Sequence, residues 1–158
     1  MNIRKGEKYD MPAVLDLIRE LAAFEKEPDA VVITADDLVR DGFGDHPLFN
    51  VLVAETADGI AGMALFYNRY STWKGKTIHL EDLVVRESMR GRGIGMELYT
   101  AVMEEAKKQN VRRVEWNVLD WNVDAIRFYE RTGAVILDDW RTVQMSEDAI
   151  GRFAEKFI

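Results

Sequence analysis

The stretch Thr77-Ile-His-Leu-Glu-Asp-Leu-Val-Val85, followed by Arg86-Glu-Ser-Met-Arg-Gly-Arg-Gly-Ile-Gly95, decides the fold. Apart from His79, Glu81 and Asp82, its first half consists of apolar and β-branched residues, which is typical of a strand. Its second half is a glycine-rich turn. Apolar residues then recur at helical spacing, at Met96, Leu98, Tyr99, Val102, Met103 and Ala106. The sequence therefore predicts a strand, a short connector, a glycine turn and a helix.

The glycine turn before this helix predicts a site for a phosphate group. The first N–H groups of a helix have no intrahelical partner and lie at the positive end of its dipole. Glycines let the main chain approach an anion closely, and Arg90 and Arg92 add positive charge. The dinucleotide fingerprint is excluded by Met96, and a P-loop by Tyr70 at its first glycine position. An ordinary strand-to-helix turn is the alternative interpretation.

Composition limits the class of protein. The chain has 158 residues, 47% of them hydrophobic, which suits a single domain spanning residues 1–158. It has no cysteine, so it has neither disulfides nor a cysteine nucleophile. No signal region or membrane span is evident, and we expect a cytoplasmic protein without a membrane partner. The net charge of −7 argues against nucleic acid and suits either a cationic ligand or solubility alone.

Periodicity and turn signals divide the whole chain into elements. We expect strands at 1–5, 49–55, 60–70, 77–85, 111–118, 135–137 and 140–145, and helices at 11–24, 35–40, 94–110, 123–132 and 146–157. Asp10, Thr34 and Asn122 are the expected N-caps, and residues 41–47 form a loop. The pattern predicts an α/β (α+β) fold, a mixed and mostly antiparallel sheet with helices on both faces.

The motif Arg90-x-x-Gly93-x-Gly95 between strand and helix resembles the acetyl-CoA signature of the GNAT superfamily of N-acetyltransferases. In that fold the central sheet is splayed at the acetyl-CoA site. The segments Asp41-Gly-Phe-Gly-Asp-His-Pro47, Leu80-Glu-Asp82 and Trp121-Asn122 look like the spermidine/spermine (diamine) branch. That resemblance covers nearly the whole chain. It implies acetylation of primary amines of polyamines or diamines, and a homodimer.

Acetyl transfer to an amine requires a base for the protonated amine and an acid for the departing thiolate. Glu81 matches the family residue implicated in deprotonation, and Tyr129 the tyrosine that faces the sulfur. Strand alternation would send Glu81 and Asp82 to opposite faces, whereas a β-bulge would bring both toward the site. Asp82 is equally well interpreted as a solvated edge charge, and Tyr129 as a core aromatic.

The resemblance implies two further groups of site residues. Those expected to bind acetyl-CoA are Leu83, Val84, Val85, Arg90, Gly91, Arg92, Gly93, Ile94, Gly95, Met96, Asn122 and Ala125. Those expected to bind the amine are Phe24, Glu25, Trp73, Glu81, Asp82, Glu115, Trp116 and Asn117. No residues have metal-ligand spacing, and we assign His46 and His79 to loop or packing roles.

The sequence therefore favours an acetyl-CoA-dependent N-acetyltransferase of polyamines or diamines that works by direct attack in a ternary complex. Three alternatives stay open. The first is the same chemistry on another small amine such as thialysine. The second is a CoA- or polyamine-binding sensor without turnover, and the third is N-acetylation of a peptide or protein.

Overall fold

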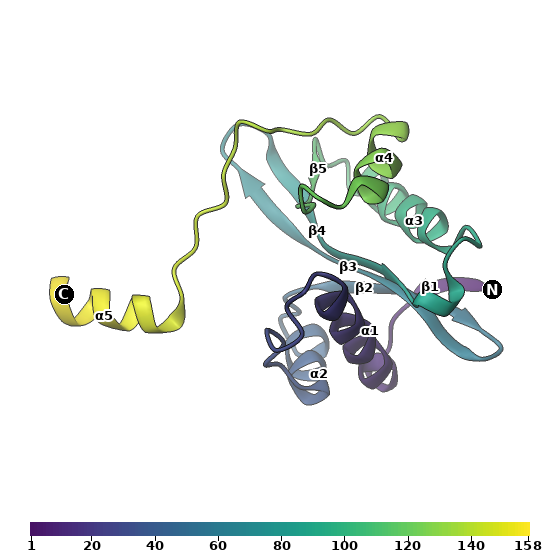
Figure 1. Ribbon diagram of the computed structural model, residues 1–158, viewed down its shortest axis with the longest axis horizontal. Coiled ribbons are helices and arrows are strands. Elements are labelled where there is room, and N and C mark those ends of the chain that lie inside the picture. The colour runs from purple at the N-terminus through teal and green to yellow at the C-terminus, as the bar shows by residue number, and fades with distance from the viewer. The chain divides into compact units, whose positions relative to one another are not determined.

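The computed structural model describes residues 1–158, which fall into two compact units, Met1–Asn117 and Val118–Ile158 (Figure 1). The first unit contains β1 (Asn2–Lys5), η1 (Lys8–Asp10), α1 (Met11–Phe24), α2 (Ala35–Phe43), β2 (Asn50–Thr56), β3 (Gly59–Ser71), β4 (Gly75–Val85), η2 (Glu87–Met89), α3 (Ile94–Lys108) and β5 (Val114–Glu115). The second contains α4 (Val123–Arg131) and α5 (Glu147–Phe157).

The five strands form one sheet in the order β1-β2-β3-β4-β5. The first four are antiparallel to their neighbours, and β5 is parallel to β4. Parallel neighbours need a crossover connection, and α3 provides it between β4 and β5. The predicted mixed, mostly antiparallel sheet is thus confirmed.

Helices cover both faces of this sheet (Figure 1). On one face, α1 and α2 bury a core that includes Leu17, Leu38 and Met63. On the other, α3 packs on the central strands and buries Leu98 and Val102. Alternation along β3 supplies side chains to both layers.

The first two helices begin at the predicted residues, but by different means. Thr34 accepts a hydrogen bond from Asp37 N in a reciprocal capping box. Asp10 occupies the N-cap position of α1 without capping it. Its buried carboxylate instead accepts two hydrogen bonds from Arg4, at 2.7 and 2.9 Å. These bonds hold the pKa of Asp10 below its ordinary value and tie β1 to α1.

Three sequence expectations about secondary structure are wrong. Helix α2 runs to Phe43, past the predicted end at residue 40, and its Gly42 lies so close to the Phe49 ring that a side chain would clash there. The strand expected at 111–118 pairs only over Val114–Glu115. Residues 135–137 and 140–145 form no strand, because their apolar alternation finds no neighbouring strand to bond.

No helix is both long and apolar enough to cross a membrane.

We predict that Met63→Ala destabilises the protein by about 2–5 kcal/mol, the usual range for emptying a buried methionine site. Met63 is 0% exposed in the layer between the sheet and α1. Denaturant unfolding followed by circular dichroism measures the change. Val32→Ala, at a residue 87% exposed, is the matched control and should lie within about 0.5 kcal/mol of the parent. Equal stabilities for the two variants would contradict the assigned core.

Candidate active site

A β-bulge in β4 lies at the two acidic residues of the predicted site. Leu65 on β3 pairs with Asp82, and its neighbour Phe66 pairs with Leu80, so Glu81 is an extra residue without a partner. Paired residues point to the same face, hence Asp82 lies on the face of Leu65. Tyr67 is two residues from Leu65 on β3 and therefore shares its face. Because the Tyr67 hydroxyl donates to the Glu81 carboxylate, Glu81 lies on this face too. The bulge therefore brings Glu81 and Asp82 to one face, where strand alternation alone would separate them.

The sheet opens at the same place. Strand β4 pairs with β5 only at Ile78–Val114 and His79–Glu115. Beyond His79 the ladder ends, whereas β4 continues to Val85. The β5-facing main-chain groups of Leu83 to Val85 are consequently not used by the sheet. The Val85 carbonyl accepts from Arg90, and the other groups are available to a ligand that lies along the strand.

The end of α1 adds a third carboxylate on this face. Burial chiefly, and then the charges of Glu81 and Glu25, raise the pKa of Asp82 to about 6. Partial burial also raises the pKa of Glu25, whose side chain still reaches solvent. Three carboxylates near one another repel when ionised and together favour a cation. A cluster of this kind can bind and deprotonate an ammonium group.

The surroundings of Glu81 contain a polar residue that sequence reasoning missed. The Tyr67 hydroxyl donates to Glu81 Oε2 at 2.9 Å. Burial, followed by the hydrogen bond to Glu81, raises the pKa of Tyr67 to about 12, so the phenol remains a donor near neutral pH. Tyr67 is fourteen residues from Glu81, and only the strand register brings them together.

The glycine turn has the geometry expected of an anion site. Gly91 and Gly93 have φ angles of 75° and 82°, which L side chains rarely adopt. Gly93 is the N-cap of α3, and the first hydrogen bond of the helix runs from Glu97 N to Gly93 O. The N–H groups of Ile94, Gly95 and Met96 therefore have no intrahelical acceptor. They could hold a pyrophosphate.

The two arginines of this turn differ in position. Arg90 donates from Nε to Val85 O at 3.1 Å, and its guanidinium lies 5.3 Å from the Phe24 ring centroid. Arg92 reaches Ser88 O at 3.5 Å and is exposed. Arg90 thus links the end of β4 to the end of α1, and Arg92 projects from the turn.

The structure separates the other predicted amine contacts of the first unit. Phe24 is half-exposed beside Arg90, and Trp73 is 78% exposed at the β3–β4 turn. Trp116 packs edge-on against Tyr99 of α3, with ring centroids 5.8 Å apart. Glu115 forms ion pairs with arginines, and Asn117 is exposed. Of these residues, Phe24 is closest in the chain to the carboxylate cluster.

The second unit carries the three remaining predicted residues, all on or before α4. Asn122 caps this helix, and its Oδ1 accepts from Ala125 N at 3.3 Å. Tyr129 is the buried residue of α4, and its ring lies 5.3 Å from that of Phe128 in an edge arrangement. The predicted cap is thus confirmed within this unit.

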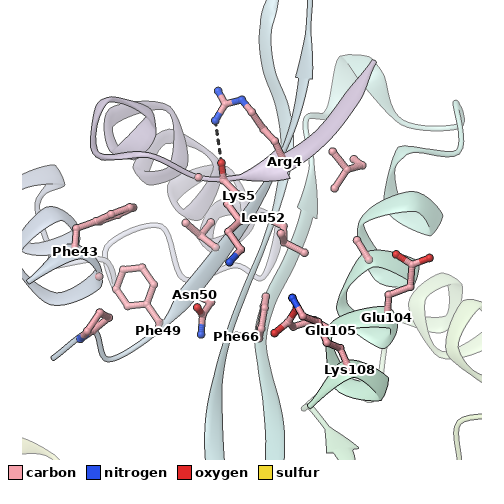
Figure 2. Close-up of a pocket in the computed structure, with 16 residues that line it drawn as sticks. Arg4, Lys5, Phe43, Phe49, Asn50, Leu52, Phe66, Glu104, Glu105 and Lys108 are labelled. Atoms are coloured by element: carbon pink, nitrogen blue, oxygen red, sulfur yellow. Dashed lines mark hydrogen bonds and ion pairs between the residues drawn. The ribbon is translucent and has the colours of Figure 1, made fainter. Parts of the chain in front are cut away.

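A groove of about 560 Å³ opens elsewhere on the first unit. Figure 2 shows Phe43 and Phe49 on one side of it, and Glu104 and Lys108 of α3 on the other. None of its lining residues belongs to the predicted acetyl-CoA or amine sites. No group of three or more histidine or acidic residues is arranged to hold a metal ion.

Comparison with known proteins agrees with this geometry. The model of the acetyltransferase (GNAT) family matches residues 12–134. The chain is 38% identical to the thialysine N-ε-acetyltransferase of Bos taurus, over 98% of this chain and 97% of that protein. It is 37% identical to the spermidine/spermine N(1)-acetyltransferase-like protein 1 of Homo sapiens, over 94% of this chain but 23% of that protein.

Other relatives extend the comparison. An L-ornithine N5-acetyltransferase of Arabidopsis thaliana is 44% identical over 78% of this chain and 52% of its own length. Among solved structures, an integron cassette protein from V. cholerae superposes with a TM-score of 0.80, at 23% identity over 98% of this chain and 97% of its own. These matches, the splayed sheet and the glycine turn place the chain in the acetyltransferase (GNAT) family, whose members use acetyl-CoA as cosubstrate.

Proposed function

We propose that this protein transfers the acetyl group of acetyl-CoA to a primary amine of a polyamine or diamine. The observation that carries the proposal is the bulge that brings Glu81 and Asp82 to one face of the sheet, near Glu25. Three carboxylates suit a substrate with more than one ammonium group. We further propose that both compact units belong to one acetyltransferase domain, since the family model spans residues 12–134.

The amine must lose a proton before it can react. A primary alkyl amine resembles lysine, whose pKa is about 10.4, and is therefore protonated at neutral pH. In our proposal Glu81 accepts that proton, directly or through water. The nitrogen then attacks the thioester carbonyl carbon, and the carbon–sulfur bond breaks as the amide forms. The nitrogen gives up its second proton in this step, which balances the proton taken up by the thiolate. Attack is direct in a ternary complex, because the chain has no cysteine to carry an acetyl group.

The departing thiolate needs a proton, and we assign it to the Tyr129 hydroxyl. Acetyl-CoA would bind along the main chain of Leu83 to Val85, with its pyrophosphate at the turn from Gly91 to Met96. The free N–H groups at the start of α3 support this assignment. Asn122 and Ala125 would lie near the cofactor, in keeping with the family resemblance.

The far end of the amine is assigned to the other acidic and aromatic residues. Glu25 and Asp82 would pair with a second ammonium group, and aromatic rings can stabilise such a cation from their faces. The residues proposed for this role are Phe24, Glu25, Trp73, Asp82, Glu115, Trp116 and Asn117. A cytoplasmic homodimer remains part of the proposal through resemblance alone.

A second candidate substrate is thialysine. It is favoured by the 38% identity to the bovine thialysine N-ε-acetyltransferase across almost the whole of both chains. Thialysine and ornithine carry a single side-chain amine beside an amino acid group, whereas polyamines lack a carboxylate. The chemistry at Glu81 would be the same, so only the far end of the pocket distinguishes these substrates.

We predict that initial rates with acetyl-CoA are highest for putrescine, spermidine or spermine in a panel that also contains thialysine, ornithine, lysine and a short peptide. A net charge of +2 or more matches three carboxylates better than the net +1 of thialysine, ornithine or lysine, whose own carboxylate offsets one of their two ammonium groups. Thiol release measures the rate. Preference for thialysine would keep the mechanism and change the substrate. Tight acetyl-CoA binding without turnover of any amine would indicate a sensor and overturn the proposal.

We predict that Glu81→Gln and Tyr129→Phe each lower kcat by about 10²–10⁴-fold, the usual contribution of a general base or acid. The KM for acetyl-CoA should change little, because neither side chain is assigned to cofactor binding. Tyr70→Phe, at a tyrosine 81% exposed on β3, is the control and should retain the parental rate. Full activity in Tyr129→Phe would remove the tyrosine from the mechanism.

We predict that Asp82 gives the amine reaction an acid limb near its pKa of about 6. As the pH falls through this value Asp82 becomes neutral, so kcat/KM for the amine should fall, and Asp82→Asn should lose this limb. Its raised folded pKa means that the folded state binds the proton more tightly than the unfolded state. Stability therefore rises as the pH falls from about 6 toward about 4. Asp82→Asn should accordingly raise the melting temperature at pH 7, and less so at pH 4.

A further inference from the structure

A polar network surrounds Glu81, and three of its residues, Tyr67, Arg69 and His79, have no role in the mechanism proposed above. It contains Tyr67 and Arg69 on β3, His79 and Glu81 on β4, and Glu115 on β5. His79 is only 8% exposed, and a buried imidazole needs polar partners, which the network supplies. These five residues, called here the His79 network, come from three adjacent strands where the sheet begins to open.

The contact between Arg69 and His79 decides which ring nitrogen carries the proton. Arg69 Nη1 lies 3.1 Å from His79 Nδ1. A guanidinium has only donors and does not lose its charge in proteins, so Nδ1 must be the acceptor. The imidazole proton therefore resides on Nε2. Burial, and the charge of Arg69, lower the pKa of His79, whereas Glu81 and Glu115 oppose this shift.

The protonated Nε2 faces the proposed base. It lies 3.5 Å from Glu81 Oε2, slightly beyond hydrogen-bond length, and the Tyr67 hydroxyl donates to the same oxygen at 2.9 Å. The Tyr67 and His79 rings also pack together, with centroids 5.3 Å apart. Oε2 thus has the Tyr67 O–H as its hydrogen-bond donor and His79 Nε2 as a second polar neighbour. No protein group donates to Oε1, so this oxygen is left for a substrate.

Arg69 is held in place from the neighbouring strand. Its guanidinium forms an ion pair with Glu115 Oε1, and Arg113 Nε lies 2.9 Å from Glu115 Oε2. Glu115 is the register partner of His79 in the last pair before β4 and β5 diverge. The ion pair therefore holds Arg69 against His79 at the last residue pair before β4 and β5 separate.

We propose that Arg69 and His79 are positioning residues for the base Glu81. Arg69 locks His79 as the neutral tautomer protonated at Nε2, and His79 together with Tyr67 orients Glu81 through Oε2. The amine N–H bond then breaks toward Oε1, where the new O–H bond forms. His79 does not itself accept this proton, because Nε2 already carries one. The catalytic part of this inference rests on the acetyltransferase function proposed above.

Nitrogen NMR of protein labelled at histidine tests the tautomer without any substrate. The chain has only two histidines, so His79→Gln assigns the signals by loss. We expect a protonated Nε2 and an unprotonated Nδ1 at pH 7 and above. In Arg69→Leu, where the remaining charged neighbours Glu81 and Glu115 favour protonation, we expect the ring to titrate at a higher pH. A protonated Nδ1 or an imidazolium in the parent at pH 7 would overturn the proposal.

Kinetics test the positioning. We expect His79→Leu and Arg69→Leu to lower kcat by about tenfold, a fraction of the contribution of the base itself, with an unchanged KM for acetyl-CoA. His79→Gln keeps an N–H donor and should recover to within about threefold of the parent. The pH profile of Arg69→Leu should gain a second acid limb, in addition to that of Asp82, and this second limb should be absent from His79→Gln.

Arg112→Leu, at an exposed arginine outside the network, is the matched control and should behave as the parent. Parental kcat in both His79→Leu and Arg69→Leu would overturn the proposal, as would equal losses in His79→Gln and His79→Leu when circular dichroism shows all variants folded. A parent without turnover on any amine would instead remove the acetyltransferase function, and the tautomer would still be decided by NMR.

Discussion

One extra residue in a central strand determines how this sheet becomes a candidate active site. Because Glu81 has no partner on β3, the alternation of side chains along β4 is interrupted there. The adjacent carboxylates of Glu81 and Asp82 therefore lie on the same face of the sheet. A regular strand would bury one of them under α3. The partial burial that raises the pKa of Asp82 is a consequence of this arrangement. A bound cation would relieve the repulsion between these like charges, as the proposed function requires.

The loss of pairing between β4 and β5 complements the bulge. The parallel ladder ends at His79–Glu115, and the next residues of β4 keep unpaired main-chain groups on that edge. A ligand with amide groups can bond to such an edge as another strand would. The helix that follows begins nearby in sequence with free N–H groups at Ile94 to Met96. One continuous segment thus offers an edge for the amides and a positive helix end for the phosphates.

The role of the histidine was not evident from sequence. His79 stands alone in the sequence pattern, and a packing role was the better interpretation of an isolated imidazole. The structure does bury it, but between Arg69, Tyr67 and Glu81. Its neighbours lie 10 and 12 residues away on an antiparallel strand, so their contact depends on register. The strands expected at 135–137 and 140–145 failed for a related reason, since apolar alternation shows a preference for strand without supplying a partner.

By itself the sequence determined the local elements whose signals lie within a few residues. These are the cap at Thr34, the glycine turn before α3, the amphipathic stripe of α1 and the alternation in the antiparallel strands. Each depends on backbone geometry or side-chain periodicity over one or two turns. Only the tertiary structure decided that Glu81 is the bulged residue, that the β4–β5 ladder stops at His79, and that Arg69 fixes the proton of His79. These features depend on strand register and on contacts between distant residues, which local propensities do not specify.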